Sequence, residues 1–205
     1  MFVIVRHGNT FEAGEAPRRI GARTDLPLTE KGRDQARALG RHFAEQGMQF
    51  GRALVSPLLR TRETARLILD CQENAPERES CDWLCEIDHG PDENQTEEAV
   101  LARIGRDALD KWDSAGDAPP DWTVDREARI EGWQQLFTNS PAADEAGTVL
   151  IVTSNGAARF GLLADPALTA SLGRLPSLKL PTGGYGVIVR DAAGRLSVSI
   201  WGQRP

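Results

Sequence analysis

The sequence predicts a three-layer α/β/α protein with a mostly parallel sheet, and two observations lead to this fold class. Unbroken apolar, β-branched runs at 1–5 and 148–153 are typical of strands buried on both faces. Strand and helix patterns also alternate along the chain, which favours a parallel sheet covered by helices. The 205 residues suit one domain, 1–205, with a mainly helical insertion at about 87–147.

The first half of the chain supplies five of the predicted elements. The run at 1–5 is followed by a helical stretch that begins after Thr29, a residue suited to an N-cap, and ends near Gly47. A second strand is predicted at 52–56, and Pro57 fits the first turn of the helix behind it. We predict a weaker third strand at 83–87.

The second half supplies the helices of the insertion and the end of the sheet. Apolar residues recur at helical spacing within 96–112 and 126–137. The strand at 148–153 leads into a helix of small residues that extends to Leu163. Two alternating runs around a turn, within 186–200, predict a β-hairpin.

The composition excludes several classes of function. A formal net charge of −6 argues against nucleic-acid partners and against an anionic membrane surface. No apolar run approaches the roughly 20 residues that span a bilayer, and no signal peptide precedes the first strand, so we expect a cytoplasmic protein. The three cysteines show no metal-ligand spacing, and we predict neither a metal site nor a cofactor.

Polar side chains follow three of the predicted strands. Because parallel strands end at one edge of a sheet, these side chains are expected to converge there. Arginines grip phosphate oxygens in pairs, and helix N-termini add backbone N–H donors, so the group predicts a site for a phosphate dianion. The residues at the three strand ends are Arg6, His7, Ser56, Arg60, Arg62, Ser154 and Asn155.

Four motifs in order resemble those of the histidine phosphatase superfamily, which has the phosphoglycerate mutase-like fold. Arg6–His7–Gly8 is similar to its Arg-His-Gly motif, and 21–32 resembles its Gly-x-x-Asp-x-Pro-Leu-Thr-x-x-Gly segment. The stretch 56–65 resembles its Ser-Pro-Leu-x-Arg helix, and 84–90 its Leu-x-Glu-x-x-x-Gly segment. The likeness covers residues 1 to about 95 and resumes near 148–160.

The resemblance implies a role for each matching residue. His7 is the expected nucleophile and forms a phosphohistidine, which splits phosphoryl transfer into two easier steps. Arg6 and Arg60 are expected to hold the phosphoryl oxygens and stabilise the transition state. Glu86 is expected to protonate the leaving oxygen and then deprotonate water. The family mechanism requires no metal.

Asn155 stands where the resemblance leads us to expect a second histidine. An asparagine amide still donates hydrogen bonds but is neutral, and losing a charged donor costs on the order of 3–4 kcal/mol in the barrier if nothing compensates. Arg159, one helical turn on, could supply the missing charge or could be a solvated helix residue, and we favour the latter. His89 is a weaker candidate for substrate contact.

Several further residues are predicted to contact substrate around the mouth of the site. Loops after the first strand commonly shape such a mouth, and Arg18 and Arg19 make this loop basic, which draws anions inward. The predicted substrate-binding residues are Asn9, Thr10, Arg23, Thr24, Ser154 and Gly156. Trp112, Trp122 and Trp133 are expected to pack the helices of the insertion.

We therefore predict a metal-independent phosphomonoesterase that acts on a small phosphorylated metabolite through a phosphohistidine at His7. One alternative is a relative of low or no activity that still binds phosphorylated ligands, which the asparagine at position 155 favours. A phosphoglycerate mutase is the third hypothesis, which we rank lowest because the chain has no long C-terminal lid to keep water from the intermediate.

Overall fold

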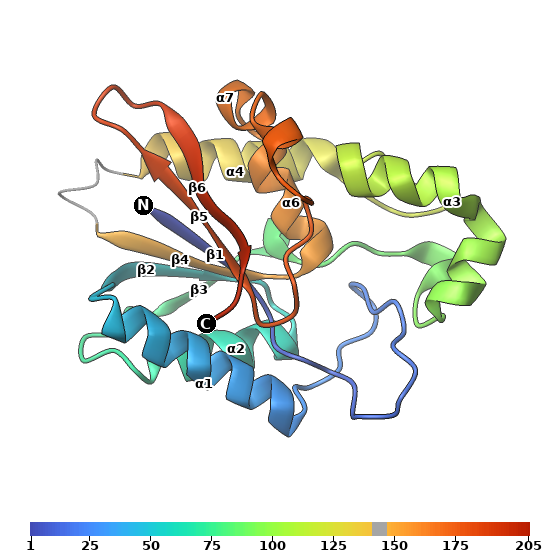
Figure 1. Ribbon diagram of the computed structural model, residues 1–205, viewed down its shortest axis with the longest axis horizontal. Coiled ribbons are helices and arrows are strands. Elements are labelled where there is room, and N and C mark those ends of the chain that lie inside the picture. Colours follow the sequence, from blue (N-terminus) through green and yellow to red (C-terminus); the bar gives the residue numbers. More distant parts are fainter. Residues whose placement is uncertain (141–146) are drawn as a thin grey trace.

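The computed structural model describes residues 1–140 and 147–205 and contains a six-stranded sheet between two layers of helices (Figure 1). The strands lie in the order β3-β2-β4-β1-β5-β6. The first four are parallel, and β5 and β6 form the antiparallel hairpin at one edge. The predicted fold class and hairpin are confirmed. The strands are β1 (Phe2–Arg6), β2 (Phe50–Val55), β3 (Arg78–Ser80), β4 (Thr148–Thr153), β5 (Tyr185–Arg190) and β6 (Leu196–Gln203).

Side chains of β1 alternate between two hydrophobic clusters, one on each face of the sheet. Phe2 and Ile4 belong to one cluster, and Val3 and Val5 belong to the other. This two-sided burial explains why the strand is apolar at every position. Each fully buried side chain of this size contributes about 1.5–3 kcal/mol relative to an exposed one.

The helices divide between the two faces (Figure 1). Helices α1 (Glu30–Glu45) and α2 (Leu59–Leu69) cover the face of Val3 and Val5. The other face is covered by α4 (Arg126–Asn139), α6 (Asn155–Leu163) and α7 (Pro166–Thr169). None of the helices in the described part of the chain is long and apolar enough to cross a lipid bilayer.

Helix α3 (Glu97–Ala115) extends from the body of the protein beyond the sheet (Figure 1). It is interrupted at Gly105, whose positive φ of 81° is a conformation that glycine adopts readily. Helices α3 and α4 lie within the predicted insertion of about 87–147, and residues 141–146 of that prediction lie outside the described residues.

The predicted strand at 83–87 is wrong. Asp82–Leu84 forms a short 3-10 helix, and the edge strand β3 lies a few residues earlier. Leu84 and Ile87 are both buried, but residues three apart point to opposite faces of a strand, so their burial fits a turn that packs on the core better than a strand with one buried face. All three residues of β3 are exposed, so the sequence carried no apolar alternation to mark it.

The parallel register brings three strand ends together. Arg6 at the end of β1 pairs with Thr153 at the end of β4, and Val55 at the end of β2 pairs with Val152. Segment 7–29 and helix α3 lie near this end of the sheet (Figure 1). The chain therefore places its post-strand residues around one edge, as ligand sites of open α/β sheets require.

Candidate active site

A cavity of about 500 Å³ lies at the carboxyl edge of the parallel strands. Its walls come from the segment after β1, from the segment after η1 (Asp82–Leu84), from α3 and from the start of α6. The cavity brings together seven of the residues predicted from the sequence, namely Arg6, His7, Asn9, Thr10, Glu86, Asn155 and Gly156.

The His7 imidazole is held in one orientation. Its Nδ1 lies 2.7 Å from the carbonyl oxygen of Gly8, which can only accept, so Nδ1 carries the proton and Nε2 keeps its lone pair. The Gly8 N–H in turn donates to the Thr64 hydroxyl at 3.1 Å. Burial and the charges of Arg60 and Arg6 hold the pKa of His7 well below its usual range. The ring is therefore neutral at pH 7.

The two predicted phosphate-binding arginines lie at different depths. Arg6 lines the cavity and donates to the Leu180 carbonyl at 2.8 Å. Arg60 is fully buried and is not among the residues that line the cavity. It donates to the carbonyls of Thr24 and Gly21 at 2.8 and 3.1 Å, and its Nε has no hydrogen-bond partner among the described residues. Arg60 thus acts on His7 through its charge.

Glu86 is fixed by two backbone donors. The N–H groups of Ile87 and Gly156 donate to its carboxylate at 2.9 and 3.1 Å. A Cβ at Gly156 would lie 2.2 Å from the carboxylate, so only glycine allows this approach. Burial raises the pKa of the Glu86 carboxyl, but His89, the two N–H groups and Arg60 outweigh burial and hold it below its usual range.

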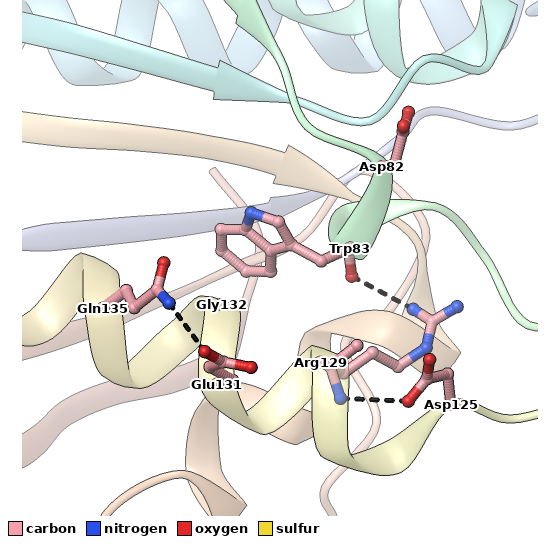
Figure 2. A pocket seen from close by; sticks show the side chains of 8 residues that line it. Asp82, Trp83, Asp125, Arg129, Glu131, Gly132 and Gln135 are labelled. Atoms are coloured by element: carbon pink, nitrogen blue, oxygen red, sulfur yellow. Dashed lines mark hydrogen bonds between the residues drawn. The ribbon is translucent and has the colours of Figure 1, made fainter.

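The backbone that carries Glu86 is held from behind by Arg129 of α4. The buried guanidinium donates to the carbonyls of Trp83 and Cys85 at 3.2 and 2.6 Å and approaches that of Glu86 at 3.5 Å. Figure 2 shows Arg129 and Trp83 in a second pocket, with the hydrogen bond from the guanidinium to the Trp83 carbonyl. Helix α4 therefore positions the backbone that carries the Glu86 carboxylate.

Asn155 is the first residue of α6, and its amide has a defined orientation. The N–H of Leu180 donates to Oδ1 at 2.9 Å, and because an N–H cannot accept, the amide nitrogen must be on the other side. Asn155 lines the cavity, so it offers two neutral N–H donors there. Ser154 is buried beside it without lining the cavity, and its hydroxyl has no partner among the described residues.

The family model of the histidine phosphatase superfamily (branch 1) matches residues 2–201. The chain belongs to this superfamily. A relative from Sinorhizobium fredii, named 2,3-bisphosphoglycerate-dependent phosphoglycerate mutase, is 30% identical over 158 residues, which are 75% of this chain and 73% of the relative.

Solved structures of low identity share the fold of this chain. A mycobacterial glucosyl-3-phosphoglycerate phosphatase with VO3 has a TM-score of 0.76 at 19% identity and covers 98% of both chains. A phosphoserine phosphatase from Entamoeba histolytica in complex with 3-phosphoglyceric acid has a TM-score of 0.70 at 21% identity, over 98% of this chain and 96% of that one.

Arg23 and Thr24, two further residues predicted to bind substrate, lie outside the cavity lining, as Ser154 does. Arg23 is exposed and its guanidinium donates to Asp88 and to the Gly90 carbonyl at 2.9 and 2.6 Å. The Thr24 hydroxyl donates to Glu93 at 2.8 Å. Burial raises the pKa of Glu93, but hydrogen bonds including that of Thr24 lower it to about 2. Glu93 therefore anchors the loop as a carboxylate, a role the sequence did not indicate.

The prediction that Arg159 is a solvated helix residue is wrong. Its side chain is 1% exposed and lines the cavity together with Trp112 and His89. A helical period places Arg159 on the same face as Asn155, and long side chains point toward the helix N-terminus, so that spacing was the signal for it. Trp112 packs in the core as expected but also forms part of the cavity wall.

Proposed function

We propose that this histidine phosphatase is a phosphomonoesterase that hydrolyses a small phosphorylated metabolite through a phosphohistidine at His7. The observation that carries the proposal is the neutral imidazole of His7, whose Nδ1 bonds the Gly8 carbonyl and whose Nε2 has no hydrogen-bond partner among the described residues. The ring lines a cavity that Arg6 and Glu86 also line. A nucleophile, a cation and a carboxylate in one cavity are the parts that phosphoryl transfer through a covalent intermediate needs.

The first half of the reaction transfers the phosphoryl group to the protein. Nε2 of His7 attacks phosphorus, the ester P–O bond breaks, and the leaving oxygen takes a proton from Glu86. The Arg6 guanidinium and the Asn155 amide donate to the phosphoryl oxygens, and the charge of Arg60 adds from behind. Because the negative ester raises the pKa of a carboxyl beside it, substrate binding favours the protonated Glu86 that this step uses.

The second half releases phosphate. The Glu86 carboxylate takes a proton from water, the water oxygen attacks phosphorus, and the P–N bond to His7 breaks. Inorganic phosphate leaves and the neutral imidazole is restored. The arginines supply all the positive charge that these steps use, and metal independence is part of the proposal.

The test measures phosphate release from p-nitrophenyl phosphate and from a panel of sugar and glycerate phosphates, with and without chelator. We expect His7→Ala to abolish release, and we expect wild-type protein quenched in alkaline detergent to carry a base-stable, acid-labile phosphate on His7. Absence of both turnover and phosphoprotein at high protein concentration would remove the proposal.

A mutase is a second candidate because several relatives bear that name, including the one from Sinorhizobium fredii. Its diagnostic result is the conversion of 3-phosphoglycerate to 2-phosphoglycerate without release of inorganic phosphate. Phosphate release that equals substrate loss excludes it.

The third candidate, a relative of low activity, is favoured by the neutral Asn155. Asn155→His separates it from the first, because an imidazolium supplies the charge that the amide lacks. A gain in turnover of about two orders of magnitude identifies the missing charge as the limiting part. Binding of phosphate esters without turnover in either protein identifies a binding protein.

A further inference from the structure

Arg159 is a buried cation that the proposed hydrolysis leaves without a role. Its guanidinium stacks on the Trp112 indole, with Cζ 4.1 Å from the ring centroid, and one nitrogen donates to the Trp112 carbonyl. Its Nε is buried and has no hydrogen-bond partner in the described part of the chain. Burial lowers the pKa of Arg159 to about 10, so the side chain keeps its charge at pH 7.

The charge of Arg159 is only partly balanced in the described structure. The nearest carboxylate is that of Asp113, at 3.8 Å from Nη1. The other oxygen of Asp113 lies closer to Lys179, at 2.6 Å from Nζ. One carboxylate therefore serves two cations, and both cations line the cavity of His7. A buried cation whose charge is only partly neutralised is strongly stabilised when an anion binds to it.

Arg159 lies further along α6 than Asn155, which is proposed to hold the transferred phosphoryl group. Asn155 begins α6 beside Glu86, whose carboxylate is bound to the N–H of Gly156. Arg159 lies one turn further along α6 and packs against α3 through Trp112. The cavity thus has a reacting end, around His7, and a second end formed by α6 and α3.

We propose that Arg159, stacked on Trp112 and supported by Lys179, forms a second anion subsite that binds a carboxylate or phosphate elsewhere on the substrate. The inference rests on the proposed function and names its substrate class, a phosphate monoester with a second anionic group. A planar guanidinium stacked on an aromatic ring presents a fixed fork to such oxygens, and hydrogen bonds to charged groups are the strong ones.

The experiment compares substrates that differ in the second group alone. Glycerol 3-phosphate and 3-phosphoglycerate differ by a carboxylate, and fructose 6-phosphate and fructose 1,6-bisphosphate differ by a phosphate. In wild-type protein we expect kcat/KM to favour one or both anionic members by about tenfold or more, and the pair that shows this preference tells carboxylate from phosphate.

Arg159→Met is expected to lower that preference ratio by about tenfold, and Arg159→Lys to retain part of it. Lys179→Gln is a second variant at a half-exposed side chain, so it does not risk the fold. Without Lys179, Asp113 is free to neutralise Arg159. We therefore expect the preference for anionic substrates to be lower in Lys179→Gln than in wild-type protein. Thermal unfolding of each variant records any general loss of stability.

Two results overturn the subsite. One is a wild-type protein that hydrolyses all four esters without preference. The other is an Arg159→Met protein in which kcat/KM falls by the same factor for both members of a pair, which would place Arg159 at the transferred group or in the packing alone. If wild-type protein hydrolyses none of the esters, the proposed function fails, and calorimetric binding of the same four compounds still decides the subsite.

Discussion

At the scale of single residues, the protonation of His7 links the proposed reaction to the stability of the fold. Burial of the ring, together with the charges of Arg60 and Arg6, keeps its pKa well below the usual value of about 6.5. In the unfolded chain the ring has its ordinary pKa. Below about pH 6.5 the unfolded state therefore binds more protons than the folded state, and folding stability must fall as the pH falls.

We therefore expect the free energy of unfolding to decrease more steeply with falling pH in wild-type protein than in His7→Gln. Between about pH 6.5 and pH 5 the ring contributes up to about 1.4 kcal/mol per pH unit, and the glutamine cannot contribute it. Chemical denaturation of both proteins in phosphate-free buffer measures the difference. Parallel curves over this window would show that His7 takes up its proton at the same pH in the folded and unfolded states and would contradict its lowered pKa.

Asn155 offers a second prediction at this scale. Asn155→Asp keeps the acceptor for the Leu180 N–H but replaces the two donors in the cavity by a negative charge. We expect kcat/KM for phosphate esters to fall by about 10²–10³ or more. Asn74→Asp makes the same charge change in an exposed segment after α2 and serves as the control. Equal effects in the two variants would mean that the amide has no part in binding phosphate.

At the scale of elements, α4 reaches the site through Arg129. Its bonds to the carbonyls of Trp83 and Cys85 set the backbone that leads into Glu86. Because a misplacement of about 1 Å can cost two orders of magnitude in rate, Arg129→Met should lower kcat at least about tenfold with a smaller change in KM. The limb of the pH–rate profile that reports Glu86 should move as well.

Arg126→Met is the matched control for this prediction. Arg126 lies on the same helix and also donates to two carbonyls, those of Ala115 and Gly116, which do not lead to Glu86. We expect Arg129→Lys to recover part of the activity because it keeps a donor near the carbonyls. If both methionine variants lose the same activity with unchanged pH profiles, Arg129 only stabilises the fold.

The elements differ in how far the sequence could predict them. Strands β1 and β4 are buried on both faces, so their apolar runs marked them to within a residue. Strand β3 lies at an exposed edge, has polar residues and is paired on one side only, so local sequence carried no trace of it. The short helix at Asp82–Leu84 has only three residues. A segment of this length is too short for the helical and strand repeats of apolar residues to be told apart.

The site shows the same division. His7, Arg6 and Glu86 stand in motifs and line one cavity, the first two from the end of β1 and Glu86 from the segment after the short helix at Asp82–Leu84. The partners of Arg23 lie some 65 positions away in sequence, and nothing local tells whether such a side chain points at substrate or at a distant carboxylate. For Arg159 the helical spacing was present, but its burial comes from the packing of α3, which spacing alone does not reveal.

At the scale of the whole molecule, charge is unevenly distributed. The chain has a formal net charge of −6, yet five cations line the cavity against three carboxylates. Two of the carboxylates, those of Glu97 and Asp113, pair with Arg19 and Lys179 at 2.5 and 2.6 Å. The cavity is thus a positive region in an acidic protein, which draws anions in and keeps them from the rest of the surface.

This field predicts that kcat/KM for a dianionic ester falls about two- to fivefold as ionic strength rises from about 0.01 M to about 0.15 M, while kcat stays level. Screening shortens the reach of the field from about 30 Å to about 8 Å over this range. Arg18, exposed at the mouth and in no ion pair among the described residues, acts through this field, so Arg18→Glu should flatten the dependence. Arg41→Glu makes the same change on the exposed side of α1 and should leave the slope intact. A slope that both variants reduce equally would trace the effect to net charge instead of the cavity.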